Sequence, residues 1–237
     1  MTVDLKNIRA LTFDVGGTVF DWHSTIRDEL ARLATERGAA LDAPAFANEW
    51  RQRMFQLLGQ VRSKELPWLN ADDLHRMAID DVAPNFPSLE LSDVDKDDLT
   101  MAWHKMNVWP DFPPALEALR TRYTVTILTV LSWGIAVDSS KHGGLSWDGI
   151  ISCEFLGHYK PDPEAYQGAV KLLGLDPGQV MMVAAHPSDL KAAMAAGLHS
   201  AYVPRIESND QSNQAEFPQP DIDINAENFE DLVRQIV

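Results

Sequence analysis

The residues best placed to do chemistry follow the first apolar segment of the chain. Ile8–Phe13 is an apolar run of strand length, and the sequence DVGGT begins directly after it at Asp14. Glycines permit a tight turn and let backbone amides point at an anion. A carboxylate in this setting could act as a nucleophile or could simply end a strand at the surface, and the segment alone leaves both interpretations open.

Five short segments have the length and composition of buried strands. Runs of β-branched and apolar residues suit strands covered on both faces, as in a parallel sheet. These segments are Ile8–Phe13, Val125–Leu131, Ile150–Phe155, Val180–Ala185 and Ser200–Val203. Helical patterns separate the later strands; one is expected to begin at Pro163, capped by Asp162, and to end at Gly174. This alternation predicts an α/β fold with a Rossmann-like, doubly wound parallel sheet.

The stretch from about residue 23 to about 108 interrupts the alternation, with boundaries good to about two to four residues. Apolar residues recur there at helical spacing in four stripes. We therefore predict a core domain of residues 1–22 and 109–237 and an inserted helical cap domain of residues 23–108. Trp50, Trp68 and Trp103 are expected to be core residues. A cap beyond the C-terminal ends of the strands could close over a site and exclude water.

Composition narrows the possible functions. The 237 residues carry a formal net charge of −15, which disfavours nucleic-acid binding and means that an anionic substrate needs Arg or Lys placed locally. No apolar run reaches membrane-span length and the N-terminus lacks a signal-peptide pattern, so we expect a cytoplasmic protein without a membrane partner. Cys153, the only cysteine, lies in an apolar stretch and is expected to be buried. The polar segment Glu207–Asp221 is expected to be a loop and is assigned no chemistry, and a last strand and a short helix, Glu227–Ile236, are expected to follow it.

The order of the motifs resembles the haloacid dehalogenase superfamily and, within it, the 2-haloacid dehalogenases. Members begin with a strand that ends in a nucleophilic Asp, followed by Gly-Thr, a hydrophobic pair and Asp. The matching residues here are Asp14, Gly17, Thr18 and Asp21. A Ser or Thr at a strand end, a Lys before a helix and an acid after a hydrophobic strand follow in the family. Those positions are filled by Thr129, Lys160 and Asp189, so the resemblance extends over nearly the whole chain.

The resemblance implies catalytic roles for three residues and no cofactor or metal. Asp14 would attack C2 of a short acid in an SN2 step and form an ester, which water would later hydrolyse at the Asp14 carbonyl. Lys160 would keep Asp14 ionised, because a nearby cation favours the charged form. Asp189 would orient or deprotonate the water.

The resemblance also implies substrate-binding residues. Thr129, with the backbone amides near Asp14 at Val15 and Gly16, would hold the substrate carboxylate. Arg51, in the expected cap, would face the leaving group or the carboxylate. His186 stands where relatives have Asn or His and could contact the hydrolytic water.

The chain departs from the family patterns at Gly16, at Val130 and in having a single acid at Asp189. Phosphatases of the superfamily carry a second Asp where this chain has Gly16, and they usually carry a pair of acids where it has only Asp189, so metal-free attack on carbon is expected instead of phosphoryl transfer. The dehalogenases usually have an aromatic residue in place of Gly16 and a halide-binding Asn in place of Val130. A valine cannot donate a hydrogen bond. The volume around Gly16, Val130 and Trp22 is expected to decide the substrate.

Three functional hypotheses remain open from the sequence. The first is an (S)-2-haloacid dehalogenase that converts a small carboxylate substrate to a 2-hydroxy acid. The second is a related hydrolase that opens a strained C–N ring such as L-azetidine-2-carboxylate, with room made by Gly16 and an apolar wall supplied by Val130. The third is a non-catalytic homologue that binds a small acid. The resemblance is also compatible with a homodimer.

Overall fold

A six-stranded sheet forms the centre of the molecule, as seen in the computed structural model, which describes residues 4–207 and 216–237. Its order is β5-β4-β1-β6-β7-β8, and every pairing is parallel. The strands are β1 (Ala10–Phe13), β4 (Thr124–Thr129), β5 (Gly149–Ser152), β6 (Val180–Ala184), β7 (His199–Tyr202) and β8 (Ile224–Asn225). The strand order reverses at β1, which is where doubly wound sheets bind ligands. The predicted α/β fold is confirmed.

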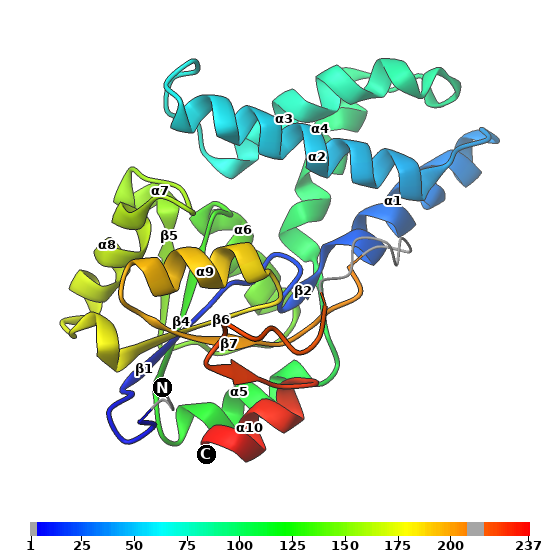
Figure 1. Cartoon of the computed structure of the whole chain (residues 1–237). Coiled ribbons are helices and arrows are strands. Elements are labelled where there is room, and N and C mark those ends of the chain that lie inside the picture. The colour runs from blue at the N-terminus through cyan, green and yellow to red at the C-terminus, as the bar shows by residue number, and fades with distance from the viewer. Residues whose placement is uncertain (1–3, 208–215) are drawn as a thin grey trace.

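Helices cover both faces of this sheet (Figure 1). They are α5 (Phe112–Arg120), α6 (Trp133–His142), α7 (Cys153–Leu156), α8 (Pro163–Leu173), α9 (Pro187–Ala195) and α10 (Phe229–Ile236), with the short 3-10 helix η4 (Pro177–Gln179). Successive strand side chains point to opposite faces. Leu11 and Phe13 therefore pack in one cluster with residues of α5, α6 and α10, whereas Ala10 and Met182 pack in a second cluster with residues of α8 and α9.

The chain between β2 and β3 forms a helical layer beside the carboxyl end of the sheet (Figure 1). Its helices are α1 (Trp22–Arg37), α2 (Ala43–Arg62), α3 (Ala71–Val82) and α4 (Asp93–Ala102), with 3-10 turns η1 (Ala83–Asn85), η2 (Pro87–Leu89) and η3 (Trp103–Lys105). The chain leaves through β2 (Phe20–Asp21) and returns through β3 (Asn107–Val108), which pair as an antiparallel ribbon. The division into a core domain and a cap domain remains a prediction, but the expected helical insertion is present.

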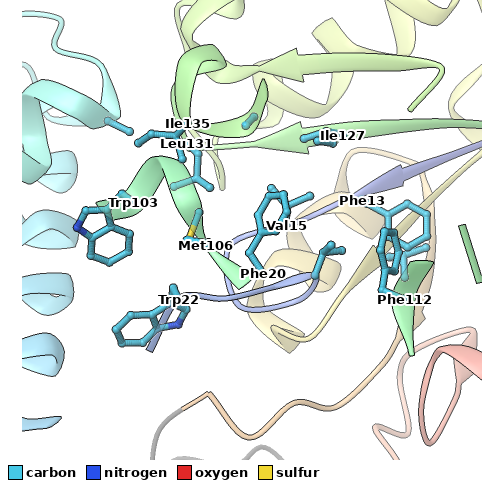
Figure 2. Close-up of a cluster of buried hydrophobic side chains, with 14 of the residues drawn as sticks. Phe13, Val15, Phe20, Trp22, Trp103, Met106, Phe112, Ile127, Leu131 and Ile135 are labelled. Atoms are coloured by element: carbon cyan, nitrogen blue, oxygen red, sulfur yellow. The ribbon is translucent and has the colours of Figure 1, made fainter. Parts of the chain in front are cut away.

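One hydrophobic cluster runs from the sheet into the inserted helices (Figure 2). The cluster begins with Phe13 on one face of the sheet, continues through Val15 and Phe20, and reaches Trp22 and Trp103. The rings of Trp22 and Trp103 stack with centroids 5.9 Å apart. Burial of such large aromatic side chains is a major source of stability, so packing joins the insertion firmly to the core.

Several sequence-based expectations are wrong in detail. The strand expected over Ile150–Phe155 ends at Ser152, because the Ser152 hydroxyl accepts a hydrogen bond from the Glu154 amide and starts helix α7. Asp162 precedes α8 as expected, but its side chain does not cap the helix and instead accepts hydrogen bonds from Arg62 on α2. Trp68 is 43% exposed and stacks on Tyr159, whereas the burial expected for Trp50 and Trp103 is confirmed.

Other features agree with the sequence more closely. Cys153 is fully buried. The final helix begins at Phe229, two residues later than expected, because the Asn228 side chain caps it. None of the described helices is long and apolar enough to cross a membrane.

Candidate active site

A cavity of about 430 Å³ lies at the carboxyl end of the sheet, between the strand ends and helix α2. Asp14 follows β1 in the chain, Thr129 ends β4, and His186 follows β6. Eight of the ten predicted site residues line this cavity: Asp14, Gly16, Arg51, Thr129, Val130, Lys160, His186 and Asp189. The parallel sheet brings them together because the carboxyl ends of its strands meet at one edge.

Asp14 is the buried carboxylate at the centre of the site. Its Oδ1 accepts a hydrogen bond from Lys160 Nζ at 2.9 Å, and its Oδ2 accepts one from the Thr18 hydroxyl at 2.8 Å. Nδ1 of His186 lies 3.1 Å from the same Oδ2. Burial alone would raise the pKa of Asp14, but the charge of Lys160 and the contact with His186 outweigh it and hold that pKa well below its usual range. Asp14 is therefore an ionised carboxylate at neutral pH.

Lys160 lies between two carboxylates. Its ammonium is 2.9 Å from Asp14 Oδ1 and 2.7 Å from Asp189 Oδ2. Burial opposes the charge, but Asp14 and Asp189 together raise the pKa of Lys160 above its usual value, so it stays protonated. The second oxygen of Asp189 accepts a hydrogen bond from the Tyr166 hydroxyl at 2.6 Å. Burial and the Asp189 charge both raise the pKa of Tyr166, which keeps that hydroxyl a donor.

Arg51 reaches the site from α2. Its Nη2 donates a hydrogen bond to the Gly16 carbonyl at 3.1 Å and lies 3.5 Å from Glu207 Oε2. The guanidinium lies over the Trp22 ring, 4.3 Å from its centroid. Burial lowers the pKa of Arg51, with Glu207 opposing the shift. An arginine remains charged in proteins, so this side chain places a positive charge at the cavity.

One part of the cavity wall is apolar. It is formed by Met54, Phe55, Leu58, Val130 and Leu131. The Thr129 hydroxyl accepts the Leu131 amide at 3.1 Å, so its own proton is free to donate to a ligand. A Cβ atom at Gly16 would lie 3.7 Å from Leu131 and 3.9 Å from Arg51. These are ordinary van der Waals distances, so the site has room for a methyl group there.

Two predicted site residues do not line the cavity. Val15 is fully buried in the hydrophobic cluster. Trp22 stacks on Trp103 and donates its indole N–H to Glu207 Oε2 at 2.8 Å. Trp22 therefore lies outside the cavity and positions two residues that line it, Glu207 and Arg51.

Three residues join the site without having been predicted there. Thr18 was matched to the family pattern but given no role; its hydroxyl donates to Asp14 and accepts the Ala185 amide at 2.9 Å. Tyr166 lies within the helix expected from Pro163 to Gly174 and is given no role by the sequence, although a phenolic hydroxyl needs a partner when buried. Glu207 belongs to the segment that was assigned no chemistry, yet its side chain lines the cavity and pairs with His186; residues 208–215 lie outside the described part of the chain.

The arrangement is that of a buried carboxylate held ionised by a buried cation, facing a cavity that is lined by Arg51 and by apolar side chains. Within residues 4–207 and 216–237, no three His, Cys, Asp or Glu side chains are grouped so that they could hold a metal ion. The ammonium of Lys160 lies directly against Asp14 and Asp189.

The comparisons with known proteins agree with this geometry. Residues 8–197 match the family model of the haloacid dehalogenase-like hydrolases, and the chain belongs to that family of hydrolases. The (S)-2-haloacid dehalogenase 4A of Burkholderia cepacia is 31% identical over 224 residues, which are 90% of this chain and 88% of that protein. The (S)-2-haloacid dehalogenase 1 of Pseudomonas sp. (strain CBS-3) is 29% identical, covering 84% of this chain and 86% of that protein.

Solved structures give the same picture. The crystal structure of an L-2-haloacid dehalogenase superimposes with a TM-score of 0.91 at 37% identity, covering 97% of this chain and 98% of that one. A defluorinating L-2-haloacid dehalogenase superimposes with a TM-score of 0.90 at 35% identity, covering 97% and 95%. The inserted helices and the sheet are thus both part of the shared fold.

Proposed function

We propose that the protein is an (S)-2-haloacid dehalogenase that converts short 2-haloacids to 2-hydroxy acids. The observation that carries the proposal is the contact between the ionised Asp14 carboxylate and Lys160 at 2.9 Å, inside a cavity that also holds Arg51. The curated relatives named (S)-2-haloacid dehalogenase support the same substrate class.

In the first half-reaction, one Asp14 oxygen forms a bond to C2 of the substrate while the bond from C2 to the halogen breaks. The electron pair leaves with the halide, and C2 is inverted, as in any SN2 displacement. Lys160 keeps the carboxylate ionised for this attack. The free proton of Thr129 and the backbone amides near Asp14 bind the substrate carboxylate.

Arg51 provides the halide-binding group that Val130 cannot provide. Val130 lines the cavity but offers no hydrogen-bond donor. The Arg51 guanidinium reaches the same cavity beside Gly16, and it supplies positive charge where a departing anion needs it. In the second half-reaction, water attacks Cγ of Asp14, the 2-hydroxy acid leaves, and the carboxylate is regenerated with one oxygen from water.

The test is intact-protein mass spectrometry after repeated turnover in heavy-oxygen water with L-2-chloropropionate. We expect heavy oxygen in Asp14 and release of chloride, both absent in an Asp14→Asn variant. Chloride release without label in Asp14 would contradict the ester mechanism. No chloride release above the Asp14→Asn background would contradict the dehalogenase assignment.

The same assay separates the other two hypotheses. A ring amine tied to its substrate needs no halide site, and the methyl groups of Val130 in the cavity wall would suit it. Labelled Asp14 together with a new primary amine from L-azetidine-2-carboxylate, and no chloride from the haloacid, would favour ring opening. Binding of these acids without label or product would favour a non-catalytic protein.

A further inference from the structure

His186 lies between two carboxylates that come from different parts of the chain. Its Nδ1 is 3.1 Å from Asp14 Oδ2, and its Nε2 is 2.6 Å from Glu207 Oε1. Glu207 is held in turn, because its Oε2 accepts the indole N–H of Trp22 at 2.8 Å and lies 3.5 Å from Arg51 Nη2. Asp14, His186 and Glu207 therefore form a carboxylate–imidazole–carboxylate chain along the wall of the cavity.

A carboxylate nucleophile followed by a histidine and an orienting acid is an arrangement that can both form and hydrolyse an ester. The nucleophile needs only to be ionised, whereas hydrolysis needs a base close to its Cγ. We propose that His186, oriented by Glu207, is the general base that deprotonates the water in the second half-reaction, and that Glu207 is its positioning residue. This inference rests on the proposed ester intermediate at Asp14.

Asp189, the residue that the family resemblance implied for this role, is poorly placed to act as a base. Its Oδ1 accepts the Tyr166 hydroxyl at 2.6 Å and its Oδ2 accepts the Lys160 ammonium at 2.7 Å. Both oxygens are thus already bound by donors, one of them a cation. Both donors would compete with a water for these oxygens. Asp189 instead anchors Lys160.

Charge changes during the reaction make His186 a base only when one is needed. In the free protein, Asp14 and Glu207 face its two ring nitrogens, with Lys160 behind Asp14 and Arg51 behind Glu207. Burial opposes protonation, but the two carboxylates raise the pKa of His186 to about 10, so the ring is a cation. Ester formation removes the charge of Asp14, which lowers the affinity of the ring for its proton.

The protons balance over one complete turnover. After the halide leaves, His186 releases one proton to solvent. It next takes a proton from the attacking water, whose oxygen bonds to Cγ of Asp14. The ester bond breaks, the departing alkoxide takes that proton from His186 and becomes the 2-hydroxy acid, and the Asp14 acid passes its remaining proton to the ring. One proton and one halide are released for each turnover, and the starting ion pair returns.

The experiment separates the two half-reactions with L-2-chloropropionate as the probe. Wild type and the variants His186→Ala, Glu207→Gln and Asp189→Asn are mixed with the probe, quenched at intervals and analysed by intact mass and chloride release. The matched control is His199→Ala, because His199 also pairs with an acid, Asp223, but lies at the amino end of β7 on the opposite edge of the sheet.

We expect the His186→Ala variant to release about one equivalent of chloride per site and then to accumulate the ester adduct, with hydrolysis slowed at least about 100-fold. Added imidazole should restore turnover, because the cavity can admit the free base. In Glu207→Gln, the acid limb of the ester-hydrolysis rate should move to lower pH by about one unit, an effect that a merely structural role would not produce. His199→Ala should behave as wild type.

Accumulation of ester in Asp189→Asn with normal hydrolysis in His186→Ala would overturn the inference and leave the proposed function intact. An unchanged pH profile in Glu207→Gln would remove Glu207 from the mechanism even if His186→Ala did not fold. Absence of Asp14-dependent chloride release from wild type would overturn both the proposed function and this inference.

Discussion

The ammonium of Lys160 lies 2.9 Å from Asp14 Oδ1 and 2.7 Å from Asp189 Oδ2, and both ion pairs are buried. A single cation thus balances Asp14, the proposed nucleophile, and Asp189, the carboxylate that holds the cation in place. Because each of these three charges depends on the others, any change at one of them alters both stability and reactivity.

Lys160→Met should remove activity and stability together. Burial would then raise the pKa of Asp14, since the main opposing charge is lost. We expect chloride release at pH 7 to fall at least about 10³-fold and the free energy of unfolding to fall by about 3–5 kcal/mol. Steady-state rates and urea unfolding measure both effects. Lys171→Met, at an exposed lysine on helix α8, which begins three residues after Lys160, should change neither; wild-type rates in Lys160→Met would disprove the role.

Thr18→Val should weaken the site more than Thr18→Ser. The Thr18 hydroxyl donates to Asp14 at 2.8 Å and accepts the Ala185 amide at 2.9 Å, so valine leaves a buried N–H without a partner. That change should destabilise the protein by about 1–3 kcal/mol and slow turnover about tenfold. Serine keeps both hydrogen bonds and loses one methyl group, worth about 0.8 kcal/mol. Equal melting temperatures for the two variants would argue against these hydrogen bonds.

The charge on His186 predicts how stability depends on pH. The pKa of its ring is raised to about 10 in the folded protein, against about 6.5 in an unfolded chain. Its contribution is therefore fully present below about pH 6.5 and is lost as the pH rises through about 10. The lowered pKa values of Asp14 and Glu207 have the opposite sign, so their contribution is lost as the pH falls below about 4.

Urea unfolding between pH 6 and pH 10 measures how the free energy of unfolding depends on pH. Wild type should lose stability across the range, and His186→Gln should lack that part of the loss, whereas His199→Gln should retain it. Nitrogen NMR of the imidazole rings gives an independent reading, with His186 still protonated at pH 8. A neutral ring at pH 8 would contradict the ion pairs with Asp14 and Glu207.

Cys153 should not react in the folded protein. It lies at the start of α7 with no exposed surface, and burial raises the pKa of its thiol to about 11. Reactivity needs an accessible thiolate. Maleimide at pH 7.5 should label the protein only after urea is added, as read by intact mass. Rapid labelling of native protein would show that β5 and α7 open readily.

The sequence predicts best those site residues that follow buried strands. Asp14, Thr129 and Asp189 stand beside long apolar runs, and the geometry of a parallel sheet then brings them together whatever the details of the loops. Only Asp14 was singled out by the local pattern; the family resemblance gave site roles to Thr129, Asp189, Lys160 and Arg51, and no local pattern could place the last two near Asp14. All five line the cavity.

What the sequence could not predict depends on contacts between distant segments. Glu207 lies in an irregular polar stretch, and its partners Trp22 and His186 are fixed only by the folded chain. Asp162 has the type and position of a helix cap, but Arg62 from the inserted helices competes for its oxygens. Local propensity is a weak guide where a distant charge offers a stronger partner.

The insertion leaves and rejoins the sheet through a single ribbon, β2 with β3, and shares one hydrophobic cluster with it through Trp22 and Trp103. The helical segment is therefore not an exchangeable module. Grafting residues 23–108 onto the sheet of a relative would transfer the α2 side chains that line the cavity. It would also separate Trp103 from Trp22, and so lose the packing that positions α2. Changes in substrate preference are expected to arise by point substitution along α2 and the strand ends, with the ribbon and its aromatic stack retained.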